Sequence, residues 1–142
     1  MTPAVEKPES EWRTELDPQR YHVLREKGTE PAWSGALLDV HDKGLFRCAG
    51  CSATLFRSDD KFDSGSGWPS FTRAVADGVI HEHEDRSFGM RRTEITCANC
   101  GGHLGHVFPD GPAPTGLRYC VNSLSMEFEP DADAAESGPT SP

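Results

Sequence analysis

Cys48-Ala-Gly-Cys51 and Cys97-Ala-Asn-Cys100 are the two stretches that decide the fold, and 45 residues separate them. Four thiolates spaced in this way can close a tetrahedral shell around zinc. Two structural disulfides, a redox-active pair or unrelated buried thiols would also account for four cysteines. A redox pair is typical of a helix N-terminus, whereas both pairs here end apparent strands. We therefore favour one structural Zn²⁺ per chain, which ties together strands that are distant in sequence.

Glycines accompany both pairs. Gly50 lies inside the first pair and Gly101 follows the second. Tight turns around a metal require backbone conformations that glycine adopts easily, so we expect these two glycines to supply them. Because a closed four-sulfur shell has no open coordination position, the metal should stabilise the fold rather than react. The chemistry must come from other residues.

The remaining sequence is typical of a mainly β protein. Asp17 followed by Pro18 predicts a helix start, with Gly28 as its stop, and Trp12 with Leu16 suggests a shorter helix before it. Short strand-like segments follow, several of them bounded by Gly, Pro or Asp turns. They cover residues 36–40, 44–48, 53–57, 79–83, 87–97, 103–108 and 117–128. The pattern predicts a mostly antiparallel β domain with short N-terminal helices.

Length and charge indicate one acidic domain. The 142 residues carry 14 Lys or Arg and 23 Asp or Glu, a net charge of −9, and this length suits a single domain. We predict a flexible N-terminus over 1–10, one catalytic domain over 11–128 and a disordered acidic tail over 129–142. Without a basic stripe, nucleic acid is a disfavoured partner. The chain also has no apolar run or signal peptide for a membrane, so we expect a cytoplasmic protein.

Cys120 is the fifth cysteine, in the stretch Gly116-Leu-Arg-Tyr-Cys-Val-Asn122. On a strand, residues two apart share a face, so Arg118, Cys120 and Asn122 should align. A neighbouring cation lowers the pKa of a thiol and raises its thiolate fraction, which would suit a nucleophile. A buried structural cysteine is the alternative interpretation.

Two histidines lie close together in Gly101-Gly-His-Leu-Gly-His-Val-Phe108. A regular strand would place His103 and His106 on opposite faces, but Gly105 permits a bulge that returns both imidazoles to one side. Two neutral histidines beside a thiolate can position and protonate an oxygen leaving group. The alternative is one structural and one solvated histidine.

An aromatic loop runs over 62–71, Phe-Asp-Ser-Gly-Ser-Gly-Trp-Pro-Ser-Phe, and is too rich in Gly and Ser for a strand. Loops on a rigid scaffold often carry binding residues, which makes Trp68 a candidate for ligand contact. A tryptophan in a loop is equally often a plug of the core.

These motifs together resemble the methionine sulfoxide reductase B family over roughly residues 11–128. The resemblance rests on both cysteine pairs and on 64–71, 102–108, Asp110-Gly-Pro112 and 118–122. It implies two antiparallel sheets in a β-tent-like fold with a structural zinc. The implied activity is reduction of the R epimer of methionine sulfoxide in oxidised proteins and peptides.

The resemblance also implies roles for the candidate residues. Cys120 would be the nucleophile, with Arg118 and Asn122 supporting its face. His103 and His106 would activate the sulfoxide oxygen, and Trp68 would pack on the methyl group of the substrate. A sulfoxide sulfur becomes electrophilic when its oxygen is protonated or strongly hydrogen-bonded, and attack leaves a sulfenic acid on the enzyme.

Ser66 departs from a common family pattern, because many members carry a resolving cysteine there and this chain has no sixth cysteine. We therefore expect a one-cysteine cycle in a monomer, completed by a low-molecular-weight thiol or a thioredoxin-type partner. Two rivals remain. A non-catalytic zinc-stabilised module that binds proteins through its aromatic loop would explain the four cysteines equally well, and a thiol peroxidase would share the sulfenic chemistry.

Overall fold

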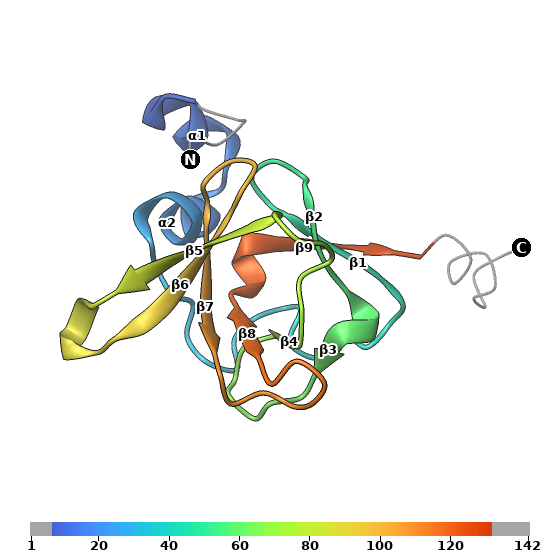
Figure 1. The fold of residues 1–142 in the computed structure, drawn as a ribbon. Helices are drawn as coiled ribbons and strands as arrows, with labels where there is room; N and C mark the ends of the chain where they lie inside the picture. Colours follow the sequence, from blue (N-terminus) through green and yellow to red (C-terminus); the bar gives the residue numbers. More distant parts are fainter. Residues whose placement is uncertain (1–6, 132–142) are drawn as a thin grey trace, which may run out of the picture.

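Two antiparallel sheets make up most of the computed structural model, which describes residues 7–131 (Figure 1). The three-stranded sheet has the order β2-β1-β9, and the six-stranded sheet has the order β3-β4-β8-β7-β6-β5. The first sheet comprises β1 (Gly44–Cys48), β2 (Thr54–Arg57) and β9 (Met126–Pro130). The second comprises β3 (Lys61–Phe62), β4 (Ser70–Phe71), β5 (Ile80–Asp85), β6 (Arg92–Cys97), β7 (His103–Phe108) and β8 (Arg118–Val121). The mainly β, two-sheet prediction is confirmed.

Aromatic side chains from both sheets form the core between them. Phe56 of β2 stacks on Phe71 of β4 with ring centroids 4.3 Å apart, and Phe46 of β1 meets the same ring edge-on at 5.0 Å. All three are fully buried, and each buried aromatic contributes a large apolar area. Met126 is also fully buried, whereas Met90 stays 45% exposed.

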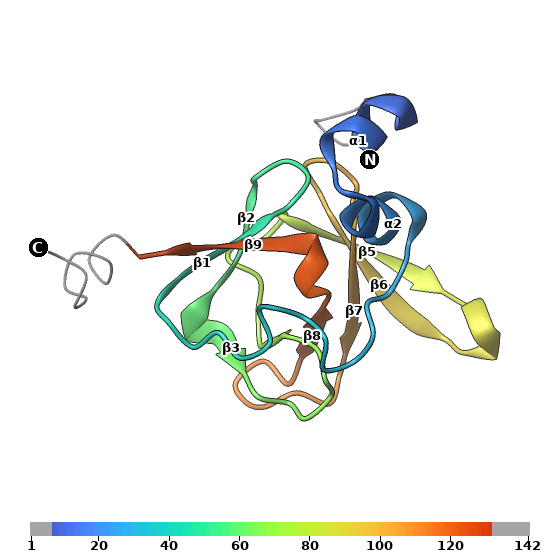
Figure 2. The same ribbon diagram turned by 180° about the vertical axis from the view of Figure 1, so that it is seen from behind.

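Two short helices, α1 (Glu9–Glu15) and α2 (Pro18–Glu26), lie near the turn between β6 and β7 (Figure 2). The predicted start of α2 is confirmed, since the Asp17 carboxylate accepts a hydrogen bond from the backbone N–H of Arg20 at 2.9 Å. Its end differs, because the left-handed residue that closes the helix is Lys27 (φ 59°) rather than Gly28. A Cβ at Gly28 would meet the ring of His22, whose side chain is 62% exposed and can rotate away.

The strand predicted over 117–128 is in fact two strands in different sheets. β8 ends at Val121, the 3-10 turn η3 (Ser123–Ser125) redirects the chain, and β9 then pairs with β1. The turn places the residues after Cys120 between the sheets. The segment 36–40 forms turns instead of a strand, and the strand predicted from residue 87 begins at Arg92 after the 3-10 turn η2 (Ser87–Gly89).

The chain ends follow the strands further than expected. β9 continues to Pro130, and the backbone N–H of Asp131 donates to Lys43 at 2.8 Å. Residues 132–142 of the predicted acidic tail and residues 1–6 of the predicted flexible N-terminus (1–10) lie outside the described part of the chain. Residues 9 and 10 of that N-terminus begin α1. Within residues 7–131, no helix is long and apolar enough to cross a bilayer.

Candidate active site and metal centre

The two cysteine pairs meet where the turn between β1 and β2 approaches the turn between β6 and β7. The four Sγ atoms lie within 4.8 Å of one another, with Cys48 to Cys100 at 3.7 Å and Cys51 to Cys97 at 3.6 Å. A metal–sulfur distance of about 2.3 Å gives a tetrahedron with edges of about 3.8 Å. All five cysteines are free, and a disulfide requires sulfurs about 2.05 Å apart. The cluster therefore has the dimensions of a four-thiolate metal site.

Both pairs use the same backbone turn. The N–H of Ser52 donates to the carbonyl of Cys48 at 2.8 Å, and the N–H of Gly101 donates to that of Cys97 at 2.7 Å. The residue after each pair is left-handed, with φ 69° at Ser52 and 79° at Gly101. Gly101 thus has the expected role, whereas Gly50 does not. The N–H of Gly50 instead points to the Cys48 sulfur at 3.4 Å.

Cys120 lies on β8 between β4 and β7, directly opposite Ser70 on one side and His106 on the other. Arg118 and Cys120 are half-buried while Tyr119 and Val121 are buried, so the predicted alternation is confirmed. Cys120 opens into a cavity of about 260 Å³, which we call the Cys120 pocket. Its walls include Thr29, Ser66, Trp68, Arg92, His106, Phe108, Arg118 and Asn122.

The electrostatics of Cys120 differ from the expectation. Burial raises the pKa of the thiol, and the Ser66 hydroxyl and the Arg118 guanidinium offset that effect only in part. Arg118 is a weak activator because its charge is already paired: Nε lies 2.9 Å from Asp110 Oδ1, and a second nitrogen lies 3.2 Å from Oδ2. The Cys120 side chain is therefore favoured in its thiol form.

The aromatic loop forms one wall of the Cys120 pocket. The indole N–H of Trp68 donates to the carbonyl of Glu30 at 2.9 Å, which fixes the half-buried ring at the pocket surface. Ser66 lies in contact with Cys120, with its Oγ 3.7 Å from the Cys120 sulfur. The resemblance implies that many members of the family carry a resolving cysteine at this position.

Both predicted histidines lie on β7, and a register shift against β6 beside Gly105 brings their rings together at 5.7 Å. The bulge prediction is confirmed. Gly105 is needed for a second reason, because a Cβ there would lie 2.0 Å from the Cys120 carbonyl. His106 lines the Cys120 pocket, whereas His103 is only 3% exposed and lies behind it.

Each imidazole is held by its own acid. His106 Nε2 lies 2.7 Å from Asp85 Oδ2, and His103 Nδ1 lies 2.8 Å from Glu94 Oε2. The hydrogen bond to His106 lowers the pKa of Asp85, and the bond to His103 lowers that of Glu94 despite the opposing effect of burial. Two ionised carboxylates can only accept, so both ring nitrogens donate. Burial lowers the pKa of His106, which Asp85 partly opposes.

Asn122 lies at the wall of the Cys120 pocket, but its amide is used for structure. Its oxygen accepts the N–H of Glu30 at 3.0 Å, and its nitrogen donates to the Leu104 carbonyl at 2.9 Å. Asn122 therefore joins the loop after α2 to β7. Through these two bonds Asn122 fixes one part of the wall of the Cys120 pocket.

Sequence reasoning missed Asp85 and Glu94, which hold the histidines. Both lie on short β segments rich in acids and bases. Such a pattern is as typical of a solvent-exposed strand face as of a functional site. The available signal was the pairing of β5 with β6, which sets Asp85 beside Arg92 and Glu94 opposite His83. That register depends on the turn at η2 and cannot be read from composition.

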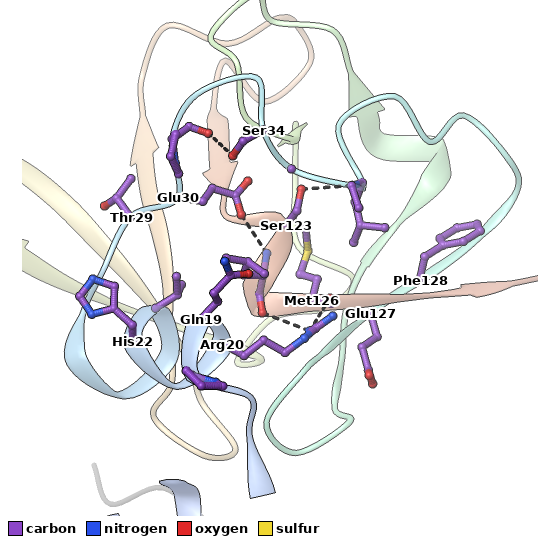
Figure 3. Close-up of a pocket in the computed structure, with 17 residues that line it drawn as sticks. Gln19, Arg20, His22, Thr29, Glu30, Ser34, Ser123, Met126, Glu127 and Phe128 are labelled. Atoms are coloured by element: carbon purple, nitrogen blue, oxygen red, sulfur yellow. Dashed lines mark hydrogen bonds between the residues drawn. The ribbon is translucent and has the colours of Figure 1, made fainter.

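A larger cavity of about 880 Å³ lies beside the Cys120 pocket, between α2, the loop over 29–37 and β9 (Figure 3). Thr29 borders both cavities. Polar groups here serve the fold: the Arg20 guanidinium donates to the carbonyls of Leu124 and Met126, and Glu30 Oε1 accepts the N–H of Leu124. No cysteine or candidate histidine lines this cavity, whereas Cys120 and His106 both line the Cys120 pocket.

The chain is similar to a known domain family and to several known proteins. Residues 16–130 match the SelR domain. The chain is 58% identical to the peptide methionine sulfoxide reductase MsrB of Agrobacterium fabrum, over 91% of this chain and 96% of that protein. It is 57% identical to the MsrB of Leptospira interrogans, over 91% and 98%. The MsrB of Methanosarcina mazei is 50% identical, over 93% and 94%.

Proposed function

Because this chain belongs to the methionine sulfoxide reductase B family, we propose that it reduces the R epimer of methionine sulfoxide in peptides and proteins through Cys120. One observation supports this most directly. Cys120 faces His106 across β7 and β8, in a pocket that Trp68 closes on one side. A nucleophile, a proton donor and an apolar wall are the three groups that sulfoxide reduction requires.

The proposed first step transfers oxygen from substrate to enzyme. The Cys120 sulfur attacks the sulfoxide, the bond from oxygen to the substrate sulfur breaks, and oxygen ends on Cys120 as a sulfenic acid that carries the original thiol proton. The thiol loses two electrons and the sulfoxide gains them, so methionine leaves without any further reductant. The raised pKa of Cys120 keeps that proton available until substrate binds.

We assign His106 as the group that polarises the sulfoxide oxygen. Its Nε2–H is bound to Asp85, so Nδ1 is the nitrogen free to carry a proton to substrate, directly or through water. His103 would act from behind, through its ring contact with His106. Arg118 and Asn122 would hold β8 and the pocket wall, and Trp68 would pack on the methyl group.

Cys48, Cys51, Cys97 and Cys100 would hold one Zn²⁺, since the separations of their sulfurs suit it. When bound in a closed four-thiolate shell, the ion supplies folding energy rather than reaction chemistry. The cysteines on the β1–β2 turn belong to one sheet and those on the β6–β7 turn to the other. The site would therefore join the two sheets of a single catalytic domain, for which 11–128 remains the proposed extent.

We propose a one-cysteine catalytic cycle. Ser66 contacts Cys120 but has no thiol, and attack by a zinc-binding cysteine would break the metal shell. A low-molecular-weight thiol or a thioredoxin-type protein would therefore attack the sulfenic acid of a monomeric enzyme, forming a mixed disulfide with loss of water. A second thiol, from another small molecule or from the same thioredoxin-type protein, would then attack the mixed disulfide and release Cys120 as a thiol.

A racemic methionine sulfoxide peptide with dithiothreitol tests the proposal. We expect the R epimer to disappear and the S epimer to persist, as followed by chiral chromatography. Cys120→Ser should abolish turnover and keep its metal content. Persistence of both epimers, or full activity in Cys120→Ser, would overturn the proposed function and leave the protein-binding module as the better interpretation.

A further inference from the structure

Lys27 closes helix α2 in a conformation that lysine rarely adopts. Its φ of 59° is left-handed, and at this helix position glycine carries no steric penalty whereas other residues do. Strained positions of this kind cluster at functional sites. Gly28 comes one residue later and so does not relieve the strain. The ammonium group of Lys27 is the part of this residue that makes specific contacts.

That ammonium lies between the two carboxylates that hold the histidines. Lys27 Nζ is 3.6 Å from Asp85 Oδ1 and 3.3 Å from Glu94 Oε1. The other oxygen of each carboxylate binds an imidazole, His106 for Asp85 and His103 for Glu94. The acids are 3% and 12% exposed, whereas Lys27 itself is 46% exposed. One cation at the surface thus contacts both buried acids behind the active site.

We propose that Lys27 is a positioning residue for the reductase reaction: it holds Asp85 and Glu94 so that each presents one oxygen to its histidine. The reaction itself rests on the proposed function. The two histidines are bound in opposite senses, His103 through Nδ1 and His106 through Nε2. The arrangement leaves Nε2 of His103 and Nδ1 of His106 free. Loss of Lys27 would let the carboxylates turn and mix these tautomers.

The two acids depend on Lys27 to different degrees. Asp85 has a second cation, Arg92 at 3.4 Å, and also accepts the N–H of Ser87 at 2.9 Å. Glu94 has no ion pair with a Lys or Arg other than Lys27 among the described residues, so its hydrogen bond with His103 is the main contact that remains without Lys27. Removal of Lys27 should therefore disturb the Glu94–His103 pair more than the Asp85–His106 pair.

The variant Lys27→Gly separates the effect of the lysine side chain from the effect of the left-handed backbone conformation. Glycine fits the left-handed conformation, so the helix end should be at least as favourable, while the ammonium is lost. We expect kcat on a sulfoxide peptide to fall roughly tenfold to a hundredfold, as for a misplaced catalytic group, with KM nearly unchanged. Lys27→Arg should recover most of the rate. Lys7→Met, which removes the ion pair of Lys7 with Glu15 at the surface, is the matched control and should keep full kcat.

Imidazole ¹⁵N NMR of the zinc-loaded protein supplies a readout independent of activity. In the wild type we expect the Nδ1–H tautomer for His103 and the Nε2–H tautomer for His106. In Lys27→Gly the His103 signals should shift toward a mixture of the two tautomers, with a smaller change at His106. Unchanged histidine signals together with an unchanged kcat would overturn the proposal. The proposal would also be overturned if Lys27→Gly lowers kcat without changing the tautomers and Lys27→Arg does not recover the rate. A wild-type protein without reductase activity would refute the proposed function, while the NMR comparison would still decide whether Lys27 orients the histidines.

Discussion

At the level of single residues, burial decides the protonation state of the Cys120 thiol. Arg118 shares a strand face with Cys120, but Asp110 binds both ends of its guanidinium and thereby reduces the field at the sulfur. Desolvation then dominates and raises the pKa of the thiol. The sequence placed Arg118 correctly beside Cys120, and Arg118 does lower the pKa of the thiol, but the larger effect of burial could not be predicted from the sequence. The partner of Arg118 lies eight residues away, in a turn whose shape the sequence does not reveal.

The pKa of Cys120 can be measured by alkylation. The rate of iodoacetamide labelling against pH should have a midpoint above the ordinary thiol value of about 8.5, because the thiolate is disfavoured by burial. Asp110→Asn should move the midpoint down, since Arg118 is then free to stabilise the thiolate. Peptide mapping distinguishes labelling of Cys120 from labelling of the four cysteines of the metal site. A wild-type midpoint at or below the ordinary value would contradict this account.

Ser66→Cys should create a resolving cysteine. Ser66 Oγ already touches the Cys120 sulfur at 3.7 Å, so only a small movement of the loop brings two sulfurs to the bonding distance of about 2.05 Å. One equivalent of sulfoxide without reductant should then yield an internal disulfide, detected by mass spectrometry. The wild type should yield a sulfenic acid that dimedone traps, with all four metal-binding thiols retained. A wild-type disulfide between Cys120 and any of those four would refute the one-cysteine cycle.

At the level of elements, β7 supplies both candidate histidines and packs against the strand that carries Cys120. Its first residue follows the second cysteine pair closely, its bulge brings His103 and His106 together, and Gly105 lets β8 approach. The bulge could be predicted from the sequence because a glycine within a strand often marks a bulge, and Gly105 lies between the two histidines. It could not indicate that the strand predicted over 117–128 divides at η3, because that break serves the pairing of β9 with the distant β1. Local patterns predicted local geometry, and long-range pairing decided the rest.

Cys97→Ser should remove both the metal and cooperative folding. A structural zinc site contributes about 10–16 kcal/mol of apparent binding free energy, which equals or exceeds the whole stability of a typical domain, about 5–15 kcal/mol. Metal analysis and urea unfolding monitored by circular dichroism measure the two effects. Cys120→Ser is the control and should keep its zinc and a single sharp transition. A folded, metal-free Cys97→Ser protein would show that the site does not support the fold.

At the level of the whole molecule, the charged groups around the histidines come from the end of α2 and from three neighbouring strands of the six-stranded sheet. Lys27 caps α2, Asp85 lies on β5, Glu94 on β6 and the histidines on β7, while Glu30 joins the loop after α2 to η3. None of these side chains is more than half exposed. Stability should therefore depend on the ionisation of the buried acids.

The free energy of unfolding should fall in acid for a defined reason. The pKa of Asp85 is lower in the folded protein than its ordinary value, so its ionised form stabilises the fold above an unfolded pKa of about 3.9. That stability is lost as pH falls through the lower folded pKa. Asp85→Asn should lose roughly 1.5–3 kcal/mol at neutral pH, as for hydrogen bonds to a charged group, and show a shallower decline between about pH 5 and 3. Urea midpoints across this range test it, since acid release of the metal affects both proteins alike. Parallel declines would contradict the assignment.

The unequal burial of two methionines makes this enzyme a candidate for its own repair. An oxidant reaches Met90, which is 45% exposed, far more readily than Met126, which is fully buried, and oxidation turns Met90 into the chemical group that a neighbouring copy reduces. Mildly oxidised Cys120→Ser protein, offered to reduced wild-type enzyme, should lose the R-sulfoxide at Met90 and keep the S-sulfoxide. If Met90 sulfoxide persists in both epimers while a sulfoxide peptide is reduced in the same tube, then one copy does not restore another. If the R-sulfoxide is removed, the molecules in a solution keep the exposed methionine of one another reduced.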